Sequence, residues 1–305
     1  MTQNEKGTAN PTVSIGMPVY NGAKYIRKAI DSLLTQTFDD FELIISDNAS
    51  TDSTESICQE CARKDSRIRY FRQSENMGGA WNFRFVFEEA KGTYFMWAAA
   101  DDMWSPDWIR RLLDNFSEDV CVSFGKIVVI GINDQILTQY HPIHLSSIKL
   151  VRLAQFFLWN SAWKANLFYG LYKRSILTAN KMDFFRVWNN RWVGADDNRP
   201  IFLALQFGRL ENDFTACYFK RDHPGSAAYH VSSSSFFVKL LHTAFPYKTI
   251  LLHCWFLWIP SKWSVKIMLL ATLPIDIIRV MTATYKNAFS QLLKKKRFPR
   301  LKSRC

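Results

Sequence analysis

Short apolar runs with β-branched residues alternate with longer segments of helical periodicity over residues 1–130. The expected strands cover residues 12–19, 41–46, 67–72 and 93–100. Helices are expected at residues 23–36, at the segment ending near residue 64, and at residues 79–90. Alternation at this spacing predicts an α/β fold with a parallel sheet covered by helices. Ligands should bind in the crevice at the carboxyl ends of such strands.

Polar residues follow three of these expected strands. Residues 18–21 lie at the end of the first strand, Asp47 follows the second, and the adjacent Asp101 and Asp102 follow the fourth, so all of them should surround one pocket. Neighbouring carboxylates resist burial unless a cation or water reaches them. Hard divalent ions bind one or two carboxylates and complete their shell with water and phosphate. The alternative is that Asp102 or Ser105 simply caps the next helix.

Three further acidic residues could bind a nucleotide or act as a general base. Asp47 could accept a hydrogen bond from a nucleobase imide or a ribose hydroxyl, or it could form an Asx turn. Asp196 and Asp197 precede another expected helix, and one of them could act as a general base. A base, a metal-and-diphosphate site and a nucleotide pocket together suit sugar transfer from a nucleoside diphosphate. The turn PVYNGAKY lacks G-x-G-x-x-G, which disfavours a dehydrogenase.

Three stretches of the sequence closely resemble the family 2 glycosyltransferases, which share the GT-A fold. They are residues 11–54, the segment ENMGGAWNF, and the segment WAAADDMWSPDWI. The resemblance is strong over residues 11–116 and looser over residues 170–226. It implies a GT-A, Rossmann-like, mostly parallel sheet flanked by helices. It also implies a nucleotide-sugar donor and a glycan or lipid-linked acceptor.

The resemblance assigns roles to residues of the donor pocket. Pro18 and Tyr20 are implied to line the nucleotide pocket, and Asp47 to contact the base. Asn76 and Gly78 resemble the loop that approaches the nucleotide sugar.

The metal site is implied by the D-x-D motif of the family. Asp101 matches its last carboxylate, which contacts both the nucleotide and a divalent metal, Mg²⁺ or Mn²⁺. The first position of the motif is Ala99 here, so the motif has one acidic group fewer, and Asp102 could compensate. His223, in KRDHPGSAA, resembles a histidine that joins the metal or the diphosphate; its alternative is an ordinary loop residue.

The catalytic base is implied by a glutamate–aspartate pair found in many members of the family. GADDNRPIFLALQFG matches this pair with Asp196 and Asp197, which makes Asp197 the expected base and Asp196 its support. The family's stereochemistry implies inversion at the anomeric carbon. The Q-x-x-R-W motif of the processive synthases is absent after Asp197, so transfer of a single sugar is expected.

The charge of the chain is concentrated at its end. The chain has 39 Lys and Arg against 27 Asp and Glu, and from Lys239 onward there are thirteen basic residues and one acidic residue. The main body has no net basic field, so nucleic acid is not an expected partner. Residues 1–231 are the expected GT-A catalytic domain, and residues 232–305 an apolar and basic helical tail.

The tail is expected to lie on a membrane rather than to cross it. Its apolar segments are interrupted by Pro260, Lys262, Pro274 and Asp276, whereas a span needs about 20 predominantly apolar residues. Interfacial helices with a basic end favour an anionic surface. A packed helical subdomain and a hairpin span are the alternatives. The polar N-terminus lacks a signal-peptide pattern, so the expected location is cytoplasmic, peripheral on the inner face of the cell membrane.

These features favour an inverting, non-processive glycosyltransferase that uses a nucleotide-diphosphate sugar, expected to be a UDP-sugar. The expected acceptor is a lipid-linked glycan in surface polysaccharide biosynthesis. One alternative is a polyprenyl-phosphate glycosyltransferase. Another is a nucleotide-binding membrane scaffold with a decayed active site, an idea motivated by Ala99.

Overall fold

The computed structural model describes residues 10–141, 143–158, 164–179, 198–224, 265–267 and 270–271. The chain divides into two compact units, residues 1–153 with 160–223, and residues 154–159 with 224–305. The predicted domain boundary between residues 231 and 232 lies outside the described residues and stays a prediction.

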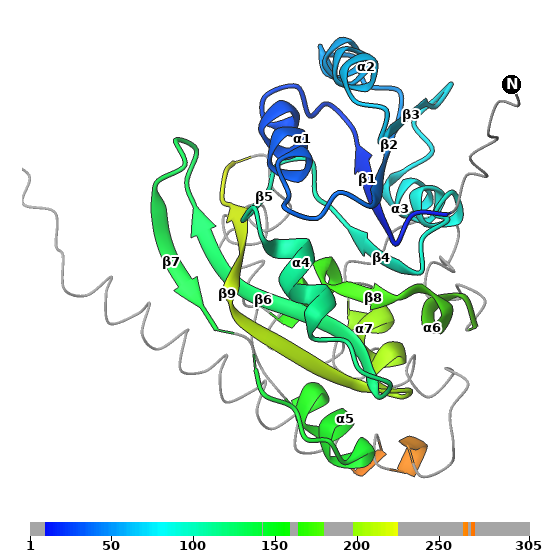
Figure 1. Ribbon diagram of the computed structural model, residues 1–305, viewed down its shortest axis with the longest axis vertical. Helices are drawn as coiled ribbons and strands as arrows, with labels where there is room; N and C mark the ends of the chain where they lie inside the picture. Colours follow the sequence, from blue (N-terminus) through cyan, green and yellow to red (C-terminus); the bar gives the residue numbers. More distant parts are fainter. Residues whose placement is uncertain are drawn as a thin grey trace, which may run out of the picture. The chain divides into compact units, whose positions relative to one another are not determined.

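The first half of the sheet is parallel and carries its helices on both faces (Figure 1). Its strands run in the order β3-β2-β1-β4, and they are β1 (Val13–Val19), β2 (Phe41–Asp47), β3 (Ile68–Arg72) and β4 (Tyr94–Trp97). The helices between them are α1 (Ile26–Leu34), α2 (Thr54–Lys64) and α3 (Gly79–Glu88). These elements confirm the predicted alternation.

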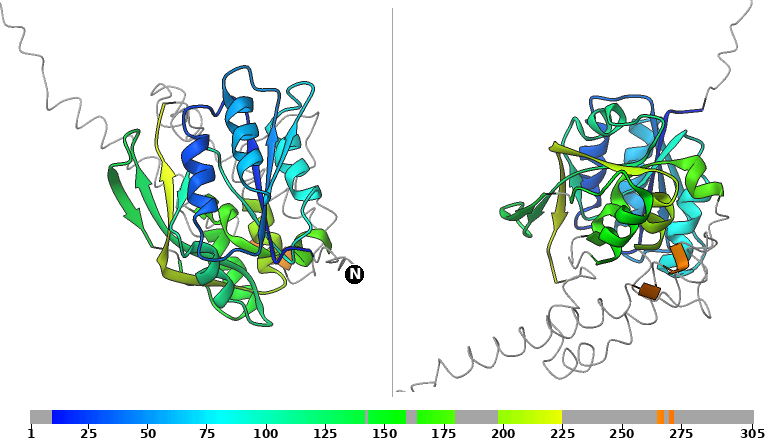
Figure 2. Two further views of the ribbon diagram at one scale, coloured as in Figure 1. Left: turned by 45° about the horizontal axis from the view of Figure 1, so that its top comes forward. Right: turned by 90° about the horizontal axis from the view of Figure 1, so that it is seen from below.

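Helices on both faces explain why the two central strands are buried along their whole length. Right-handed crossovers put α1 and α2 on one face and α3 on the other, because the strand order reverses after β3 (Figure 2). Every residue of β1 and β2 is consequently buried. The polar residues that follow these strands are the first that can reach a ligand.

The fourth strand is shorter than the sequence pattern suggests. It was expected to reach Ala100, but β4 ends at Trp97. Just beyond the strand, the amide of Ala98 donates a hydrogen bond to the Gly16 carbonyl of β1 at 2.8 Å. The chain then turns, so that β5 (Met103–Trp104) pairs antiparallel with a late strand, β9 (Arg209–Arg221). Helix α4 (Trp108–Asp114) begins after this pairing.

The second half makes the sheet mixed. Its other strands are β6 (Val120–Ile130), β7 (Ile136–Tyr140) and β8 (Leu171–Lys173). Strand β8 is antiparallel to both β4 and β6, whereas β6 and β9 are parallel. The remaining helices are α5 (Lys149–Leu158), the 3₁₀ helix η1 (Lys164–Tyr169), α6 (Arg174–Ala179) and α7 (Asn198–Leu205). The described residues thus form one nine-stranded sheet.

Strand β9 is positioned by close contact with β6. A Cβ atom added to Gly125 of β6 would lie 2.4 Å from the carbonyl oxygen of Ala216 and 2.4 Å from the Trp108 ring. Only glycine leaves room for both neighbours. The close approach lets β9 follow β6 to the pair Ile130 and Arg221, so β9 ends at the same edge as β1, β2 and β4.

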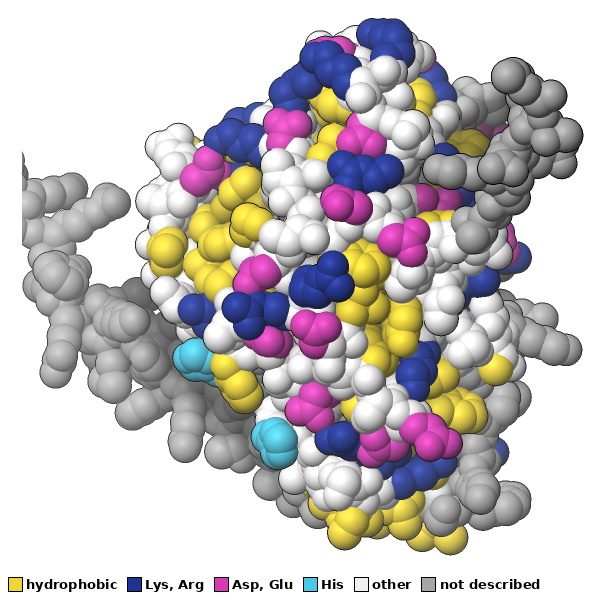
Figure 3. Space-filling view, viewed as in Figure 1, with side chains coloured by type: hydrophobic (Ala, Val, Ile, Leu, Met, Phe, Trp, Pro, Cys, Tyr) yellow, Lys and Arg dark blue, Asp and Glu magenta, His cyan; other side chains and the backbone are white. Residues whose placement is uncertain are grey.

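Strand β7 carries an exposed apolar surface. Ile136 and Leu137 are more than half exposed, and Ile132 in the preceding turn is 48% exposed. Figure 3 shows hydrophobic side chains gathered on the left of this face, where Figure 1 draws β7.

No helix in the described part of the chain is long and apolar enough to cross a bilayer. The predicted tail, residues 232–305, lies outside the described residues except for 265–267 and 270–271, which are helical. Its helical and membrane-associating character therefore stays a prediction.

Candidate functional site

The segments that follow the parallel strands emerge at one edge of the sheet. The register pairs Val19 of β1 with Asp47 of β2, and Gly16 of β1 with Trp97 of β4. Pro18 is buried within β1 opposite Ser46, whereas Tyr20 is 50% exposed just beyond the strand. An exposed aromatic ring at this position can stack on a base.

The loops after β1 and β2 are joined by hydrogen bonds. Asn21 adopts a left-handed backbone with φ of 52°, and its side-chain oxygen accepts a bond from the Thr51 amide at 2.8 Å. The Asn21 amide donates to the Ser50 hydroxyl at 2.8 Å. The two loops that are expected to lie beside the base are therefore hydrogen-bonded to each other.

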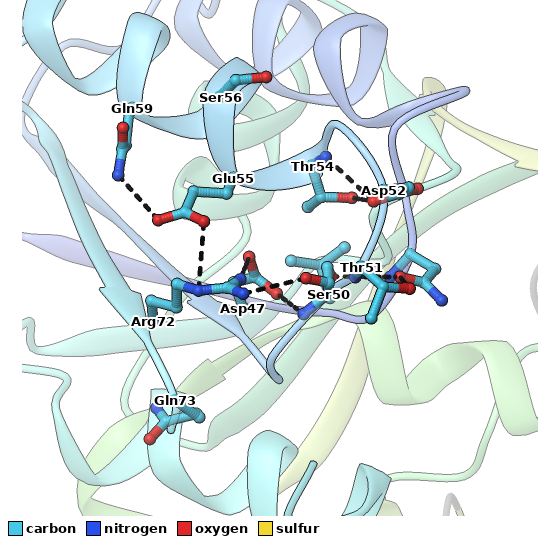
Figure 4. A network of polar contacts seen from close by, with 12 residues as sticks. Asp47, Ser50, Thr51, Asp52, Thr54, Glu55, Ser56, Gln59, Arg72 and Gln73 are labelled. Atoms are coloured by element: carbon cyan, nitrogen blue, oxygen red, sulfur yellow. Dashed lines mark hydrogen bonds and ion pairs between the residues drawn. The ribbon is translucent and has the colours of Figure 1, made fainter. Parts of the chain in front are cut away.

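Asp47 is completely buried and fully bound by protein groups (Figure 4). Its Oδ1 accepts the Ser50 amide at 2.8 Å. Its Oδ2 accepts the Tyr70 hydroxyl and Nη1 of Arg72, each at 2.9 Å. Burial, together with the bond to Asp47, raises the pKa of Tyr70 well above its ordinary value. A direct contact from the Asp47 carboxylate to a base would require one of these donors to give way.

Arg72 is a site residue that the sequence interpretation missed. It lies at the end of β3, where its guanidinium also donates to the Ser50 carbonyl at 3.0 Å and pairs with Glu55 at 3.2 Å. Its side chain is 35% exposed, so it presents a positive charge to solvent beside a buried carboxylate. The only available signal was its place at a strand end.

Asn76 and Gly78 lie in the loop between β3 and α3, as the sequence predicts. The loop is anchored by Asn48, which the sequence interpretation missed: its Nδ2 donates to Oδ1 of Asn76 at 2.8 Å, and its Oδ1 accepts the Met77 amide at 2.9 Å. Gly78 has φ of 86°, a left-handed conformation that favours glycine. The loop is thus held at the end of β2.

Helix α3 is fastened to the same edge through Asn82. The buried side-chain amide of Asn82 donates to the carbonyl oxygens of Ser46, at 2.9 Å, and Val19, at 3.4 Å. Val19 is the last residue of β1, and Ser46 is the last but one of β2. The helix that follows the Asn76 loop is therefore held at a fixed distance from the strand ends.

Asp101 and His223 come together from distant parts of the chain. Oδ2 of Asp101, in the turn after β4, lies 2.9 Å from Nε2 of His223, which follows β9. Their side chains are 33% and 14% exposed, and the ring of Tyr25 packs against that of His223 with centroids 4.8 Å apart. One carboxylate oxygen and one imidazole nitrogen thus share a partly open position.

Asp102 forms its hydrogen bonds with β9 and not with His223. It is buried, its Oδ1 accepts the Arg221 amide at 2.7 Å, and its Oδ2 accepts the Tyr218 hydroxyl. Burial, reinforced by the charge of Asp101, raises the pKa of Asp102 to about 6. Asp102 would have to leave both partners on β9 to bind a metal, so its predicted compensation for Ala99 has no support in this geometry.

The Asp101–His223 pair suits a divalent cation in its donor types. Carboxylate oxygen suits Mg²⁺ and Mn²⁺, and imidazole nitrogen binds transition metals. No group of three or more His, Cys, Asp or Glu side chains in the described ranges could hold a metal ion. Two protein ligands are sufficient where substrate phosphate and water complete the shell.

Asp196 and Asp197 lie outside the described residues, directly before α7. Their predicted roles as base and support are therefore untested by this geometry and stay predictions.

Relatives in sequence are glycosyltransferases and match less than half of the chain. An uncharacterized glycosyltransferase of Rickettsia bellii is 34% identical over 46% of this chain and 20% of its own length. The putative teichuronic acid biosynthesis glycosyltransferase TuaG of Bacillus subtilis is 35% identical over 36% of this chain and 44% of its own. Chondroitin synthase of Escherichia coli is 36% identical over 37% of this chain and 16% of its own length. The first relatives are thus matched over a third or less of their length.

Solved structures resemble the chain over most of its length. TarS of S. aureus in complex with UDP-GlcNAc has a TM-score of 0.60 and 18% identity, covering 87% of this chain and 72% of that one. The mannosyltransferase PcManGT of Pyrobaculum calidifontis, in complex with GDP-Man and Mn²⁺, has a TM-score of 0.56 and 16% identity. The match covers 93% of this chain and 76% of PcManGT. At such identities the likeness concerns the fold, and the expected GT-A fold is confirmed.

The family model described as glycosyl transferase family 2 matches residues 14–180. The match includes all of β1 except Val13, the loops after β1 and β2, the Asn76 loop and Asp101, and it spans more than half of the sequence. The chain belongs to glycosyl transferase family 2.

Proposed function

We propose that the chain is an inverting, non-processive glycosyltransferase that transfers one sugar from a UDP-sugar to an acceptor hydroxyl. The observation that carries the proposal is the Asp101–His223 pair at the strand edge shared with Tyr20 and Asp47. It combines a site for a cation and diphosphate with a surface for a base. The fold is that of proteins crystallised with UDP-GlcNAc and with GDP-Man and Mn²⁺.

Each residue has its own part in binding the donor. Tyr20 lines the base, Pro18 lies buried in β1 just before it, and Asp47 orders the base side through Ser50, Tyr70 and Arg72. The Asn76 loop approaches the sugar. Asp101 and His223 would hold a divalent cation, which supplies stabilisation of the negative charge on the leaving diphosphate.

In the proposed reaction the acceptor oxygen attacks the anomeric carbon from the face opposite the diphosphate. Asp197 accepts the proton of the acceptor hydroxyl as the new carbon–oxygen bond forms. The bond between the anomeric carbon and the diphosphate breaks, and the electron pair leaves with the UDP. A single displacement of this kind inverts the configuration.

A panel of nucleotide sugars tests the donor. With Mn²⁺ present, UDP-sugars are expected to raise the melting temperature most. At a ligand concentration of 100 times Kd the stabilisation is about 2.7 kcal/mol, which corresponds to roughly 5–10 °C for a domain of this size. Equal shifts with GDP- and dTDP-sugars would contradict the UDP assignment. Absence of any metal-dependent shift or donor turnover in folded protein would contradict the enzyme.

The proposed setting is the cytoplasmic face of a membrane, with a lipid-linked glycan as acceptor. The apolar and basic composition of residues 232–305 supports this, as does the similarity to the putative teichuronic acid biosynthesis glycosyltransferase TuaG. Deleting residues 236–305 is expected to move the protein from the membrane fraction to the supernatant, and high salt should release part of the full chain. Unchanged fractionation after both treatments would contradict the peripheral model.

A polyprenyl phosphate is the second candidate acceptor, favoured by the same tail. The two acceptors differ in chemistry, because a phosphate oxygen is already ionised at neutral pH and needs no general base. Transfer to a polyprenyl phosphate should therefore survive the loss of Asp197, whereas transfer to a hydroxyl should not.

A further inference from the structure

Arg221 is a buried cation in the middle of the proposed metal-binding edge. Its side chain is 1% exposed, and it is the last residue of β9, two residues before His223. A charge buried to this degree is costly unless it is paired and hydrogen-bonded. The bonds of Arg221 therefore show what its burial stabilises.

The guanidinium of Arg221 ties three segments together. Its Nε donates to the backbone carbonyl of Asp101 at 2.9 Å. Its Nη1 donates to the Gly131 carbonyl at 3.0 Å and pairs with Asp134 at 2.5 Å, both in the turn between β6 and β7. The Asp134 carboxylate is also bound by Lys28 of α1. The carboxylate that balances Arg221 is thus itself fixed.

The main chain of Arg221 holds the same turn a second time. Its amide donates to Oδ1 of Asp102 at 2.7 Å. The turn that carries Asp101 is consequently attached to the end of β9 by two bonds, one from the Arg221 side chain and one to the Asp102 side chain. Neither bond uses the Asp101 carboxylate, which stays available to its partner.

Tyr25 lies in contact with both Arg221 and His223. The Arg221 guanidinium lies over the Tyr25 ring, 4.6 Å from its centroid, and the same ring packs against His223. A cation over an aromatic face is attractive and orients the ring. Arg221 therefore acts on His223 through Tyr25 as well as through the two residues of chain that separate them.

We propose that Arg221 is a positioning residue that sets the separation and orientation of Asp101 and His223 for binding a divalent cation together with a nucleoside diphosphate. The inference rests on the proposed function. Arginine suits the role because its planar fork makes several directed bonds at once, which lysine cannot reproduce. Partners behind metal ligands typically govern metal affinity, and their loss costs about 10–100-fold.

The test is a calorimetric titration of Mn²⁺ into full-length protein saturated with UDP. Arg221→Lys keeps the charge that Asp134 needs and loses the fork, so Mn²⁺ affinity should fall about 10–100-fold. UDP affinity measured without metal should stay within a few-fold of that of the wild type. In donor hydrolysis, the Mn²⁺ concentration for half-maximal rate should rise more than kcat at saturating Mn²⁺ falls.

Arg209→Lys is the matched control, because Arg209 begins the same strand and pairs with the exposed Asp119 and the half-buried Glu211. It should leave Mn²⁺ affinity unchanged. If Arg221→Lys does not fold, Asp134→Asn removes the partner of the guanidinium and should lower Mn²⁺ affinity in the same direction.

The outcomes separate the two proposals. Wild-type Mn²⁺ affinity in folded Arg221→Lys, or in folded Asp134→Asn when only that variant folds, would overturn the role of Arg221 alone. Equal losses of metal-free UDP affinity and Mn²⁺ affinity would overturn it too, since they indicate a general structural role. A wild-type protein that binds no Mn²⁺ with UDP would overturn the proposed function, and the Arg221 role with it.

Discussion

Asp101→Asn should lower the rate of sugar transfer on the order of 10²–10³-fold at fixed Mn²⁺, because charge stabilisation by a metal supplies several kcal/mol and each tenfold in rate corresponds to about 1.4 kcal/mol. The amide keeps the size of the carboxylate and can still bond His223, so folding should be preserved. The cation, however, loses its charged ligand. Initial rates across a titration of Mn²⁺, with melting temperature measured in parallel, report the effect.

Asp114→Asn provides the comparison for this variant. Asp114 is an exposed residue at the end of α4, and its variant should keep wild-type rates and metal dependence. Full activity of Asp101→Asn without added metal would show that Asp101 is not a ligand. A lower melting temperature that accompanied the loss of rate would point instead to damage in the turn.

Asp197→Asn should lower kcat for transfer to a hydroxyl acceptor by about 10²–10⁴-fold, the range expected for removal of a general base. Donor affinity should be unchanged, because the base acts on the acceptor. Calorimetry with UDP-sugar and Mn²⁺ measures donor binding, and single-turnover transfer measures the chemical step.

Asp196→Asn separates the base from its support. It removes the same charge from the adjacent position and should cost less than Asp197→Asn if Asp197 is the base. The reverse order would exchange the two assignments. Normal turnover in both variants would remove the pair from the mechanism, while a loss of donor affinity in both would suggest that the pair binds the donor.

The parallel half of the fold could be predicted because its signals are local. Strands β1 and β2 are mostly apolar, and the helix after β1 has clear periodicity. The carboxyl-edge rule then placed Pro18, Tyr20, Asp47 and Asp101 at one edge from residue order alone.

Strand β9 could not be predicted in the same way. Its burial alternates irregularly along thirteen residues, and its partner β6 lies about ninety residues earlier, with two register shifts between them. No local pattern encodes such a pairing. The consequences of that pairing, namely the bonds of Asp102 to Tyr218 and to Arg221, were therefore invisible in the sequence.

Asp101 and Asp102 show the limit most clearly. Both residues were candidate metal ligands, with a helix cap as the alternative for Asp102, yet the backbone turns the Asp101 side chain toward His223 and that of Asp102 toward Tyr218 of β9. The sequence could pair Asp101 with His223 only through resemblance to the family. Asn48 and Arg72 were missed because their importance lies in what they hold in place.

The carboxylate of Asp134 joins Lys28 on the first helix to Arg221 on the last strand of the first unit. The helix of Lys28 starts shortly after Tyr20, at the base end of the proposed donor, while Arg221 stands behind its diphosphate end. A single acidic side chain in the turn between β6 and β7 thus links the helix at the base end to the strand behind the diphosphate end. A donor would meet a preorganised frame, and little of its binding energy would be consumed in shaping the site.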